Sequence, residues 1–320
     1  MPRRPFPGGL DPTWFEGVPC YECGADDSAP FRLAEDDLTG LPGTFRFVRC
    51  GRCGLAYQNP RLVLERVKAY YDDRYISHRR REDWGVLTPL YRRAMDGHDR
   101  RKEGIVLRHV RLAPGSEVLD VGCGAGTFLT RLRERHGVRA AAVDFKDMTF
   151  REDVRAIEFH LGLFYEQALG RDRFDLITMW HFLEHDYDPL RSLRHAREAL
   201  APDGRLVIEV PRLDSLTARI FGDRWPGLQA PQHTVLLDRE HLLRFLSRAG
   251  LEVVEWLPYG AFPPWFYVFA GIAFHALKGR GLDVGRLMLP YFVGQLAFLP
   301  VLLFERRLDL AMQTVVARRP

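Results

Sequence analysis

The stretch Val118-Leu119-Asp120-Val121-Gly122-Cys123-Gly124-Ala125-Gly126-Thr127 decides the fold of this chain. Its first part is mostly apolar and predicts a short buried strand over 117–121, and an amphipathic helix is expected to begin at Thr127. The glycines in between let the backbone turn tightly and approach a ligand closely. The helix start adds free N–H groups and the positive end of the helix dipole. The stretch therefore predicts a ligand-binding loop.

Strands and helices alternate after this loop. Strands are expected at 140–143, 156–160, 174–179, 205–210, 251–257 and 312–317, and helices at 127–135, 189–200 and 238–249. Pro202-Asp203-Gly204 is expected to form a turn. This alternation predicts an α/β fold with a mostly parallel sheet and helices on both faces.

The glycine spacing differs from the Gly-x-Gly-x-x-Gly pattern of dinucleotide-binding loops. It resembles motif I of the class I methyltransferases that use S-adenosyl-L-methionine (SAM). The resemblance implies that Gly122, Gly124 and Gly126 line the methionine part of SAM and that Asp120 supports them. It also implies that Asp144, which ends the next strand, binds the ribose hydroxyls.

The resemblance extends over residues 116–257. Asp172-Arg173-Phe174-Asp175-Leu176-Ile177 is similar to the family's fourth strand, and Leu200–Leu206 to its turn before the fifth strand. Leu163 and Phe164 stand where the family often has an acid or amide for the adenine, so they are expected to pack on the base. The fold expected from the resemblance is a Rossmann-like class I methyltransferase sheet.

Cysteine pairs near the N-terminus predict a metal site. Cys20 and Cys23 form one Cys-x-x-Cys-Gly pattern, and Cys50 and Cys53 form another. We see no secretory signal at the start of the chain, which favours a reducing cytoplasmic location and metal ligands over disulfides. Because four thiolates with this spacing complete a tetrahedron, the sequence predicts a structural zinc ion, with free or redox cysteines as the alternative.

A four-cysteine ribbon before a SAM-binding domain resembles two families: sugar C-methyltransferases acting on nucleotide-linked deoxysugars, and ribosomal-RNA base methyltransferases. Asn59-Pro60, Tyr70-Tyr71 and Tyr75 look more like the first family. The tyrosines are expected either in a lid over the cofactor or packed on one helix face.

The segment Trp180-His181-Phe182-Leu183-Glu184-His185 follows the fourth strand, at the edge of the sheet where ligands bind in open α/β folds. It is similar to the Glu-x-x-Glu-His metal motif of ubiquinone-type O-methyltransferases. His181 replaces the first Glu, which argues against Mg²⁺ because that ion prefers oxygen ligands. We predict His181 as a hydrogen bonder or general base, with Glu184 and His185 supporting it. The alternative is a structural role for all three.

His233 is a second catalytic candidate. It lies in the long loop after the fifth strand, which also carries Trp225. Loops carry function more often than core elements do, so His233 is predicted as a base or substrate anchor. The alternative is that it only orders the loop.

Residues 259–308 form an apolar insertion before the last strand. The stretches 259–277 and 287–304 contain no Asp, Glu, Lys or Arg. Because the sheet must close on both sides of the insertion, its two ends lie on the same side of any membrane. Prolines at 263, 264, 290 and 300 favour shallow pieces over spanning helices. The insertion is predicted to dock on a membrane surface, with a buried cap or dimer interface as the alternative.

These observations divide the chain into functional parts. The expected parts are a flexible tail (1–18), a zinc ribbon (19–59), a helical lid (60–112), a SAM-binding core (113–258), the insertion (259–308) and the last strand (309–320). The arginine-rich stretch from Arg79 to Lys102 could face anionic lipid or a phosphorylated substrate, but a solvated helix face is the favoured interpretation.

The predicted function is methyl transfer from SAM to a small-molecule or lipid-linked acceptor, in the cytoplasm or on the inner face of the membrane. One alternative is a zinc-ribbon RNA base methyltransferase, which the formal net charge of only +4 and the apolar insertion disfavour. The other is a catalytically inactive membrane scaffold with the same fold. The intact glycine loop and Asp144 argue against a scaffold.

Overall fold

The structure is a computed structural model, and it describes all residues except 1–9, 72–87, 279, 283 and 303. A central seven-stranded sheet has the order β12-β13-β10-β9-β6-β7-β8. These strands are β6 (Glu117–Val121), β7 (Arg139–Asp144), β8 (Glu158–Leu161), β9 (Phe174–Trp180), β10 (Leu200–Pro211), β12 (Glu252–Leu257) and β13 (Met312–Arg318).

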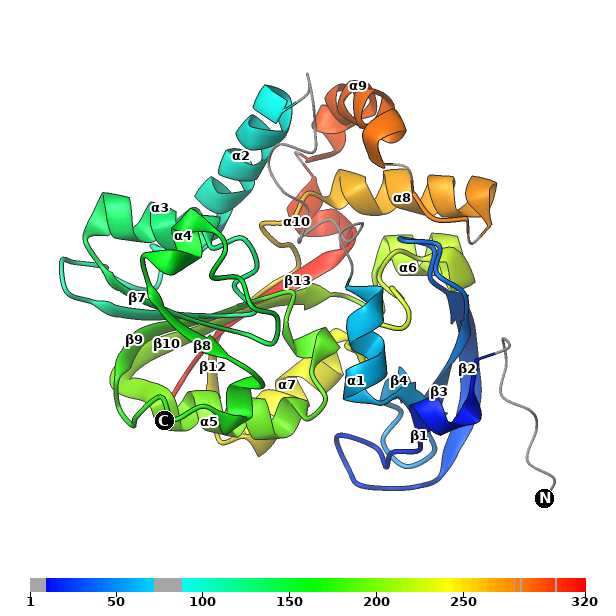
Figure 1. Cartoon of the computed structure of the whole chain (residues 1–320), viewed down its shortest axis with the longest axis horizontal. Coiled ribbons are helices and arrows are strands. Elements are labelled where there is room, and N and C mark those ends of the chain that lie inside the picture. The colour runs from blue at the N-terminus through cyan, green and yellow to red at the C-terminus, as the bar shows by residue number, and fades with distance from the viewer. Residues whose placement is uncertain (1–9, 72–87, 279, 283, 303) are drawn as a thin grey trace.

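Strands β10, β9, β6, β7 and β8 are parallel to one another, whereas β13 runs antiparallel to both β10 and β12. Helices cover both faces (Figure 1): α2 (Thr88–Val106), α3 (Thr127–His136) and α4 (Glu152–Arg155) lie on one side, and α5 (Pro189–Ala199) and α7 (Arg239–Arg248) on the other. The predicted α/β architecture with a mostly parallel sheet is confirmed.

Local sequence signals place the main elements well. Gly126 and Gly137 adopt positive φ angles of 73° and 68° and bound α3, as expected for glycines at helix ends. Asp188 and Asp238 accept hydrogen bonds from backbone N–H groups in the first turns of α5 and α7. The turn expected at 202–204 lies within β10 as an irregularity: regular pairing with β9 breaks after Leu200 and resumes at Arg205.

The cysteine module, residues 19–59, is part of a second sheet rather than a separate unit. Its strands β2 (Ser28–Glu35), β3 (Thr44–Cys50) and β4 (Ala56–Gln58) are joined by β11 (Val235–Leu236), which follows β10 in the chain. The module also shares its apolar core with the helices below the central sheet, where Leu55 and Tyr57 pack in the same cluster as Leu193 and Phe245. The expected boundary at residue 59 is therefore not a gap between domains.

The predicted flexible tail is wrong over the part that the structure describes. Pro12–Trp14 form a 3-10 turn, and β1 (Phe15–Glu16) pairs antiparallel with β5 (Arg61–Leu62). Backbone pairing and the packing of Phe15 beside Phe45 hold this segment in place. Residues 1–9 lie outside the described residues.

The lid region is only partly helical. Residues 64–67 form α1 and residues 68–70 a 3-10 turn, before α2 begins at Thr88. Tyr75 and the basic residues Arg79, Arg80 and Arg81 lie outside the described residues. Within α2, Arg92, Arg93, Arg100 and Arg101 are exposed, as a solvated face requires, whereas Asp96 and Glu103 pair with Arg131 of α3 and Lys102 lines the cavity described below.

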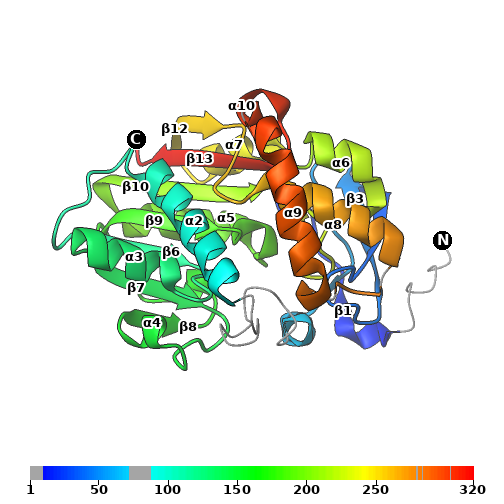
Figure 2. The ribbon, with the colours of Figure 1, turned by 90° about the horizontal axis from the view of Figure 1, so that it is seen from above.

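The insertion forms helices before the final strand, as expected. It contains α8 (Pro264–Leu277), α9 (Val284–Leu302) and α10 (Glu305–Leu308). Helix α8 packs against α6 (Leu216–Phe221) and α9, and together α8 and α9 lie above the border between the two sheets (Figures 1 and 2). Within the described ranges, no helix combines the length and apolar character that crossing a bilayer requires.

Candidate active site

A cavity of about 300 Å³ lies beyond the carboxyl ends of β6, β7 and β9. Its lining comes from the glycine loop, the segments after β7, β8, β9 and β10, helices α1 and α2, and the start of the insertion. The lining residues used below are Gly122, Gly124, Asp144, Leu163, Phe164, His98, His181, His185, Tyr187, His233, Phe262, Phe266 and Tyr267. The topology thus brings distant parts of the sequence together at the sheet edge expected for ligands.

The glycine loop leaves an open cradle on the cavity side. A Cβ atom on Gly122 would lie 3.1 Å from the Phe182 ring, and the φ angle of 75° is one that side chains rarely adopt. At Gly124 nothing lies within 4 Å of the Cβ position. Only glycine gives this loop both its shape and its open surface.

Asp144 closes the other side of the cradle. Its two carboxylate oxygens accept the backbone N–H groups of Gly124 at 3.1 Å and Lys146 at 3.0 Å. Burial raises the pKa of Asp144 against the lowering effect of these bonds. The carboxylate is therefore held at the end of β7 beside the glycine loop, where the sequence placed a ribose-binding acid.

Asp120 and Gly126 support the loop from behind and do not line the cavity. The Thr178 hydroxyl donates a hydrogen bond of 2.6 Å to the buried Asp120 carboxylate, and burial raises the pKa of that carboxyl to about 6. Gly126 starts helix α3. A supporting role was the prediction for Asp120, whereas Gly126 was expected to line the ligand.

Leu163 and Phe164 line the cavity beyond β8. Phe164 is buried, and its ring packs edge-on against Phe182 at 6.2 Å and His195 at 4.9 Å between ring centroids. Both side chains are apolar and offer a surface rather than a hydrogen bond. Their predicted packing on the adenine stays a prediction.

His181 lies between two buried carboxylates. Its Nδ1 is 3.4 Å from Glu184 Oε1, and its Nε2 is 3.3 Å from Glu209 Oε1. Burial opposes charge on the ring, but the two carboxylates outweigh it and raise the pKa of His181 to about 9. The two carboxylates thus favour the protonated form of the ring, and each ring nitrogen faces one of them.

Glu209 connects His181 to the insertion. It is fully buried near the end of β10 and accepts the backbone N–H groups of Ala261 at 2.5 Å and Phe262 at 3.0 Å. The imidazolium of His181 and these N–H groups outweigh burial and lower the pKa of Glu209. This carboxylate fixes the first residues of the insertion beside the cavity.

His185 and His233 form a neutral pair on the same wall as His181, and His233 Nε2 lies 4.0 Å from Glu184 Oε1. Their rings meet edge-on with centroids 4.4 Å apart. The Nδ1 of His185 is 3.1 Å from the Gln232 carbonyl and 2.9 Å from the Tyr71 hydroxyl, and the Nδ1 of His233 is 2.9 Å from the Gly227 carbonyl. Burial lowers the pKa of each ring to about 3.

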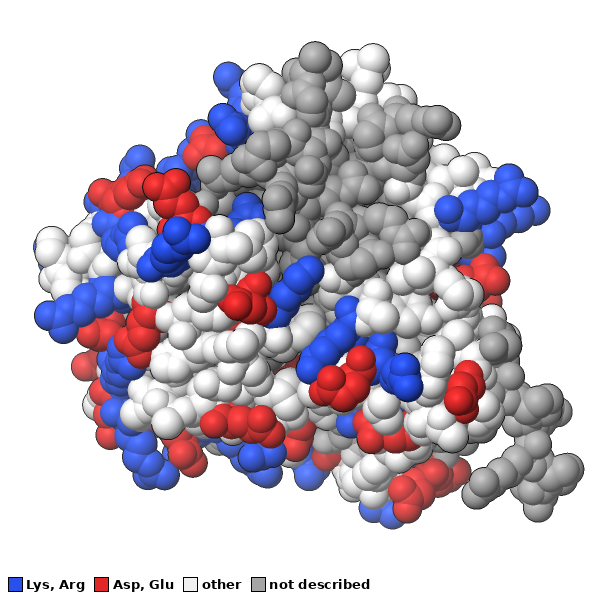
Figure 3. All heavy atoms as spheres, viewed as in Figure 1, with Lys and Arg blue, Asp and Glu red and all other residues white. Residues whose placement is uncertain are grey.

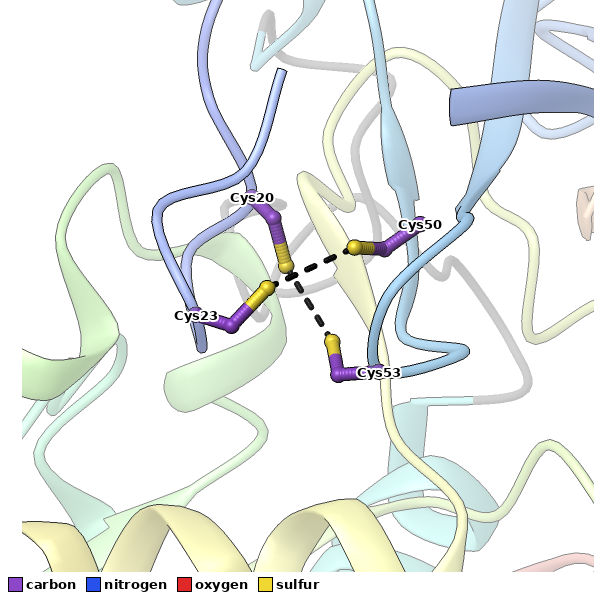
Figure 4. A group of neighbouring side chains, drawn as sticks. All are labelled: Cys20, Cys23, Cys50 and Cys53. Atoms are coloured by element: carbon purple, nitrogen blue, oxygen red, sulfur yellow. Dashed lines mark hydrogen bonds between the residues drawn. The ribbon is translucent and has the colours of Figure 1, made fainter. Parts of the chain in front are cut away.

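The four cysteines meet at one point away from the cavity (Figure 4). Cys20 Sγ lies 3.4 Å from Cys53 Sγ, and Cys23 Sγ lies 3.5 Å from Cys50 Sγ. Sulfurs held tetrahedrally about 2.3 Å from a zinc ion would be about 3.8 Å apart, so the observed spacing fits zinc and is too long for disulfides. Burial raises the pKa of Cys20 to about 11, so a metal ion bound here would have to displace the thiol protons.

Comparison with known proteins identifies the core. The methyltransferase domain family matches residues 91–256, which is more than half of the chain. The chain belongs to the methyltransferase domain family. The expected membership among class I SAM-dependent methyltransferases is confirmed, and the sheet order and glycine loop described above belong to this methyltransferase domain.

Individual relatives match parts of the methyltransferase domain. An uncharacterized 37.1 kDa transposon protein of Streptomyces fradiae is 32% identical over 126 residues, which cover 37% of this chain and 36% of that protein. Ubiquinone biosynthesis O-methyltransferase of Haemophilus ducreyi is 34% identical over 162 residues, covering 44% of this chain and 67% of that enzyme. The chain thus spans about a third of the length of the first relative.

Among solved structures, a putative sarcosine dimethylglycine methyltransferase from Galdieria sulphuraria is 15% identical to this chain. The match covers 70% of this chain and 86% of that one, with a TM-score of 0.47.

The structure also adds residues to the methyltransferase site that sequence reasoning missed. His98, on α2, lines the cavity with its ring edge-on to Phe262 at 5.5 Å between centroids. Its Nε2 is buried without a hydrogen-bond partner in the described part of the chain. Burial and the nearby charges of Lys102 and His181 lower the pKa of His98 well below its usual range. No sequence motif surrounds His98, so only the fold reveals it.

Proposed function

We propose that this chain transfers the methyl group of SAM to a small, largely apolar acceptor. The observation that carries the proposal is one continuous cavity that joins the glycine cradle and Asp144 to an aromatic cluster. A donor and an acceptor bound in one cavity can be aligned for direct transfer, which is the main contribution of such a protein. When bound, SAM supplies an electrophilic methyl group and loses its positive charge on transfer.

The acceptor side of the cavity favours an apolar ring or chain. Phe262, Phe266 and Tyr267 stand at the start of the insertion and pack edge-on against one another. Phe262 also packs edge-on against His181 at 4.9 Å between centroids. Aromatic walls with few polar groups are typical of sites for apolar small molecules.

We propose His98 as the group that takes a proton from the acceptor. A general base must be unprotonated and must present a lone pair to the cavity. His98 lines the cavity, its lowered pKa keeps the ring uncharged, and its buried Nε2 has no hydrogen-bond partner among the described residues. As the acceptor's oxygen or carbon forms its bond to the methyl group, its proton moves to His98 Nε2, and the total charge in the cavity is unchanged.

The two histidines predicted from sequence receive other roles in this proposal. His181 is a fixed cation beside the acceptor rather than a base, because both of its nitrogens face carboxylates. His233 is an anchor of the wall, because it is 2% exposed and its Nδ1 is held by a carbonyl. Both line the cavity.

The experiment that tests the proposed function is methyl transfer from tritiated SAM into a total cell extract. The labelled products are separated into lipid, nucleic-acid and aqueous small-molecule fractions. We expect label in the lipid or small-molecule fraction, because aromatic side chains line the acceptor side of the cavity. Label in RNA alone would support the zinc-ribbon RNA methyltransferase, and SAM binding without any labelled product would support the scaffold.

The molecular face shown in Figure 3 gives no support to the RNA alternative. Lys and Arg are interspersed with Asp and Glu there, and neither charge forms a continuous field (Figure 3). Binding of RNA by its phosphates requires a contiguous basic surface. In our proposal Cys20, Cys23, Cys50 and Cys53 hold zinc for structure and do not contact nucleic acid.

We also propose that α9 docks on a membrane surface and brings the cavity close to apolar acceptors. Leu289, Val293 and Leu296 repeat at helical spacing and are 60–69% exposed. Lys278 and Arg307 are exposed at the two ends of this apolar surface. Apolar side chains with flanking basic residues fit the interface of an anionic bilayer.

Flotation with vesicles of phosphatidylcholine and phosphatidylglycerol tests this docking. Replacing Leu289, Val293 and Leu296 together with glutamine should lower the bound fraction at least about tenfold, since each leucine buried in the interface contributes about 1.5–3 kcal/mol. The three side chains are exposed, so folding and SAM binding are expected to stay intact.

A matched control carries three glutamines at exposed apolar positions elsewhere: Leu33, Phe150 and Leu161. This control should float as the wild type does. Equal flotation of the α9 variant and the wild type would show that α9 is not the docking surface.

A further inference from the structure

The chain leaves the cysteine module along one wall of the cavity. Gln58 ends β4 and Arg61 begins β5, and both side chains reach segments that lie far away in the sequence. Two such segments form what we call the acceptor wall: residues 181–187 after β9 and residues 227–236 after β10. They carry His181, His185 and His233.

Gln58 is fully buried and holds the second of these segments. Its Nε2 donates to the carbonyls of Pro231 at 3.3 Å and His233 at 3.0 Å, and its backbone N–H donates to the Thr234 carbonyl at 2.8 Å. The side-chain oxygen of Gln58 has no hydrogen-bond partner among the described residues. The side chain thus acts through its two N–H donors alone.

The segment held by Gln58 is bonded in turn to the residues that face the cavity. The Gln232 carbonyl lies between the two carbonyls that Gln58 binds, and it contacts His185 Nδ1 at 3.1 Å. The Thr234 N–H donates to the Glu184 carbonyl at 2.8 Å, and the Thr234 hydroxyl donates to the Asp186 carbonyl at 2.6 Å. A shift of the Gln58 contacts would therefore move both segments of the wall.

Arg61 holds the first segment. Its Nη1 donates to the Tyr187 carbonyl at 2.8 Å and to the Tyr21 hydroxyl at 2.7 Å, and its Nε pairs with Glu16 at 2.7 Å. The guanidinium also stacks 4.1 Å above the centre of the Tyr187 ring, which lines the cavity. Because Tyr21 lies between Cys20 and Cys23, Arg61 ties the first cysteine pair to the wall.

We propose that Gln58 and Arg61 are positioning residues that make the cysteine module a built-in support for the acceptor wall. This positioning role rests on the proposed function, because that function assigns this wall of the cavity to the methyl acceptor. It assigns the module a role inside the enzyme, in which its metal-bound fold sets the positions of His185 and His233. The donor side is not involved, because within the described part of the chain the side-chain hydrogen bonds of Gln58 and Arg61 go to residues other than the glycine loop and Asp144.

The test compares the zinc-loaded, full-length wild type with Gln58→Met, which keeps the size of the side chain and removes both donors. Backbone amide exchange of residues 181–187 and 227–236 should become about tenfold faster in the variant, since two buried carbonyls lose their partners. Zinc content and SAM affinity by isothermal titration should equal those of the wild type.

A second variant, Arg61→Lys, covers the case in which Gln58→Met fails to fold. A single ammonium cannot reach Glu16, Tyr21 and Tyr187 together, so exchange should rise in residues 181–187. Arg49→Gln is the matched control, because Arg49 is exposed in the same module and its side chain donates to the Gly54 carbonyl rather than to the acceptor wall. The control should exchange as the wild type does.

Activity supplies the second readout. In both positioning variants, methyl transfer into the acceptor fraction should fall about 10- to 100-fold, as expected for small misplacement of an acceptor, with the KM for SAM unchanged. Unchanged amide exchange in the acceptor wall of both variants would overturn the proposal. Faster amide exchange that is confined to the cysteine module and accompanied by loss of zinc would also overturn it. The wild type could transfer no label to any acceptor while the variants still show faster amide exchange in the acceptor wall. That result would reject the proposed function but would keep the positioning role of Gln58 and Arg61.

Discussion

Replacing His98 with asparagine should reduce methyl transfer by about 10²- to 10⁴-fold, the usual contribution of a general base. Asparagine is close to histidine in size and polarity but cannot take a proton near neutral pH. His98 lies on α2 and its recorded contacts do not include the glycine loop, so SAM affinity should stay that of the wild type. The measurements are the initial rate with the labelled acceptor fraction and isothermal titration with SAM.

The control for His98→Asn is Asp144→Ala, which should show the opposite pattern. Removing the carboxylate takes away the acceptor of the Gly124 and Lys146 N–H groups and the expected ribose contact. SAM binding should be lost in that variant. Full activity of His98→Asn would show that the proton goes elsewhere, and weakened SAM binding in His98→Asn would show that His98 belongs to the donor side.

Removing the metal from the cysteine module should destabilise the whole chain rather than the module alone. The module shares its core with α5 and α7, and β11 of the methyltransferase domain completes its sheet. His241 and Arg244 of α7 also bind the Cys53 carbonyl at 3.2 and 3.0 Å. We expect the free energy of unfolding to fall by on the order of 5–10 kcal/mol when Cys50 and Cys53 are replaced with serine.

Thermal unfolding and metal analysis, with and without a chelator, measure this effect. The serine variant and the chelated wild type should melt at similar, lowered temperatures in one cooperative step. Cys123→Ala is the control, because Cys123 is a cysteine of the glycine loop outside the module and should keep the metal. A chelated chain that melts at the wild-type temperature would contradict a structural role for zinc.

Predictability from sequence differed sharply between the two sides of the cavity. The donor side follows from local patterns, because the strand, the glycine turn and Asp144 lie within 28 consecutive residues, 117–144, and each requires a specific backbone shape. The cysteine ligands are equally local, since each pair sits in one tight turn. Most of the sheet could be predicted for the same reason. The turn expected at 202–204 lies in the irregular part of β10, where the register against β9 breaks between Leu200 and Arg205.

The acceptor side could be predicted only in part. The segment after β9 and the loop with His233 were found because ligands bind beyond the carboxyl ends of strands. Their electrostatics were not predictable, since the charge of His181 depends on Glu209, a residue 28 positions away on a neighbouring strand. His98 and Phe262 carry no motif, and they meet only because α2 and the insertion cover the same edge of the sheet.

The sequence by itself determined the glycine loop, the two cysteine pairs and the order of the elements, because these depend on residues close together in the chain. Only the tertiary structure decided what the cysteine module does beside the active site. Gln58 lies 173 and 175 residues from the two carbonyls that it holds, and no local pattern records such contacts. They arise when β11 joins the module's sheet, which places the acceptor wall between the module and the central sheet.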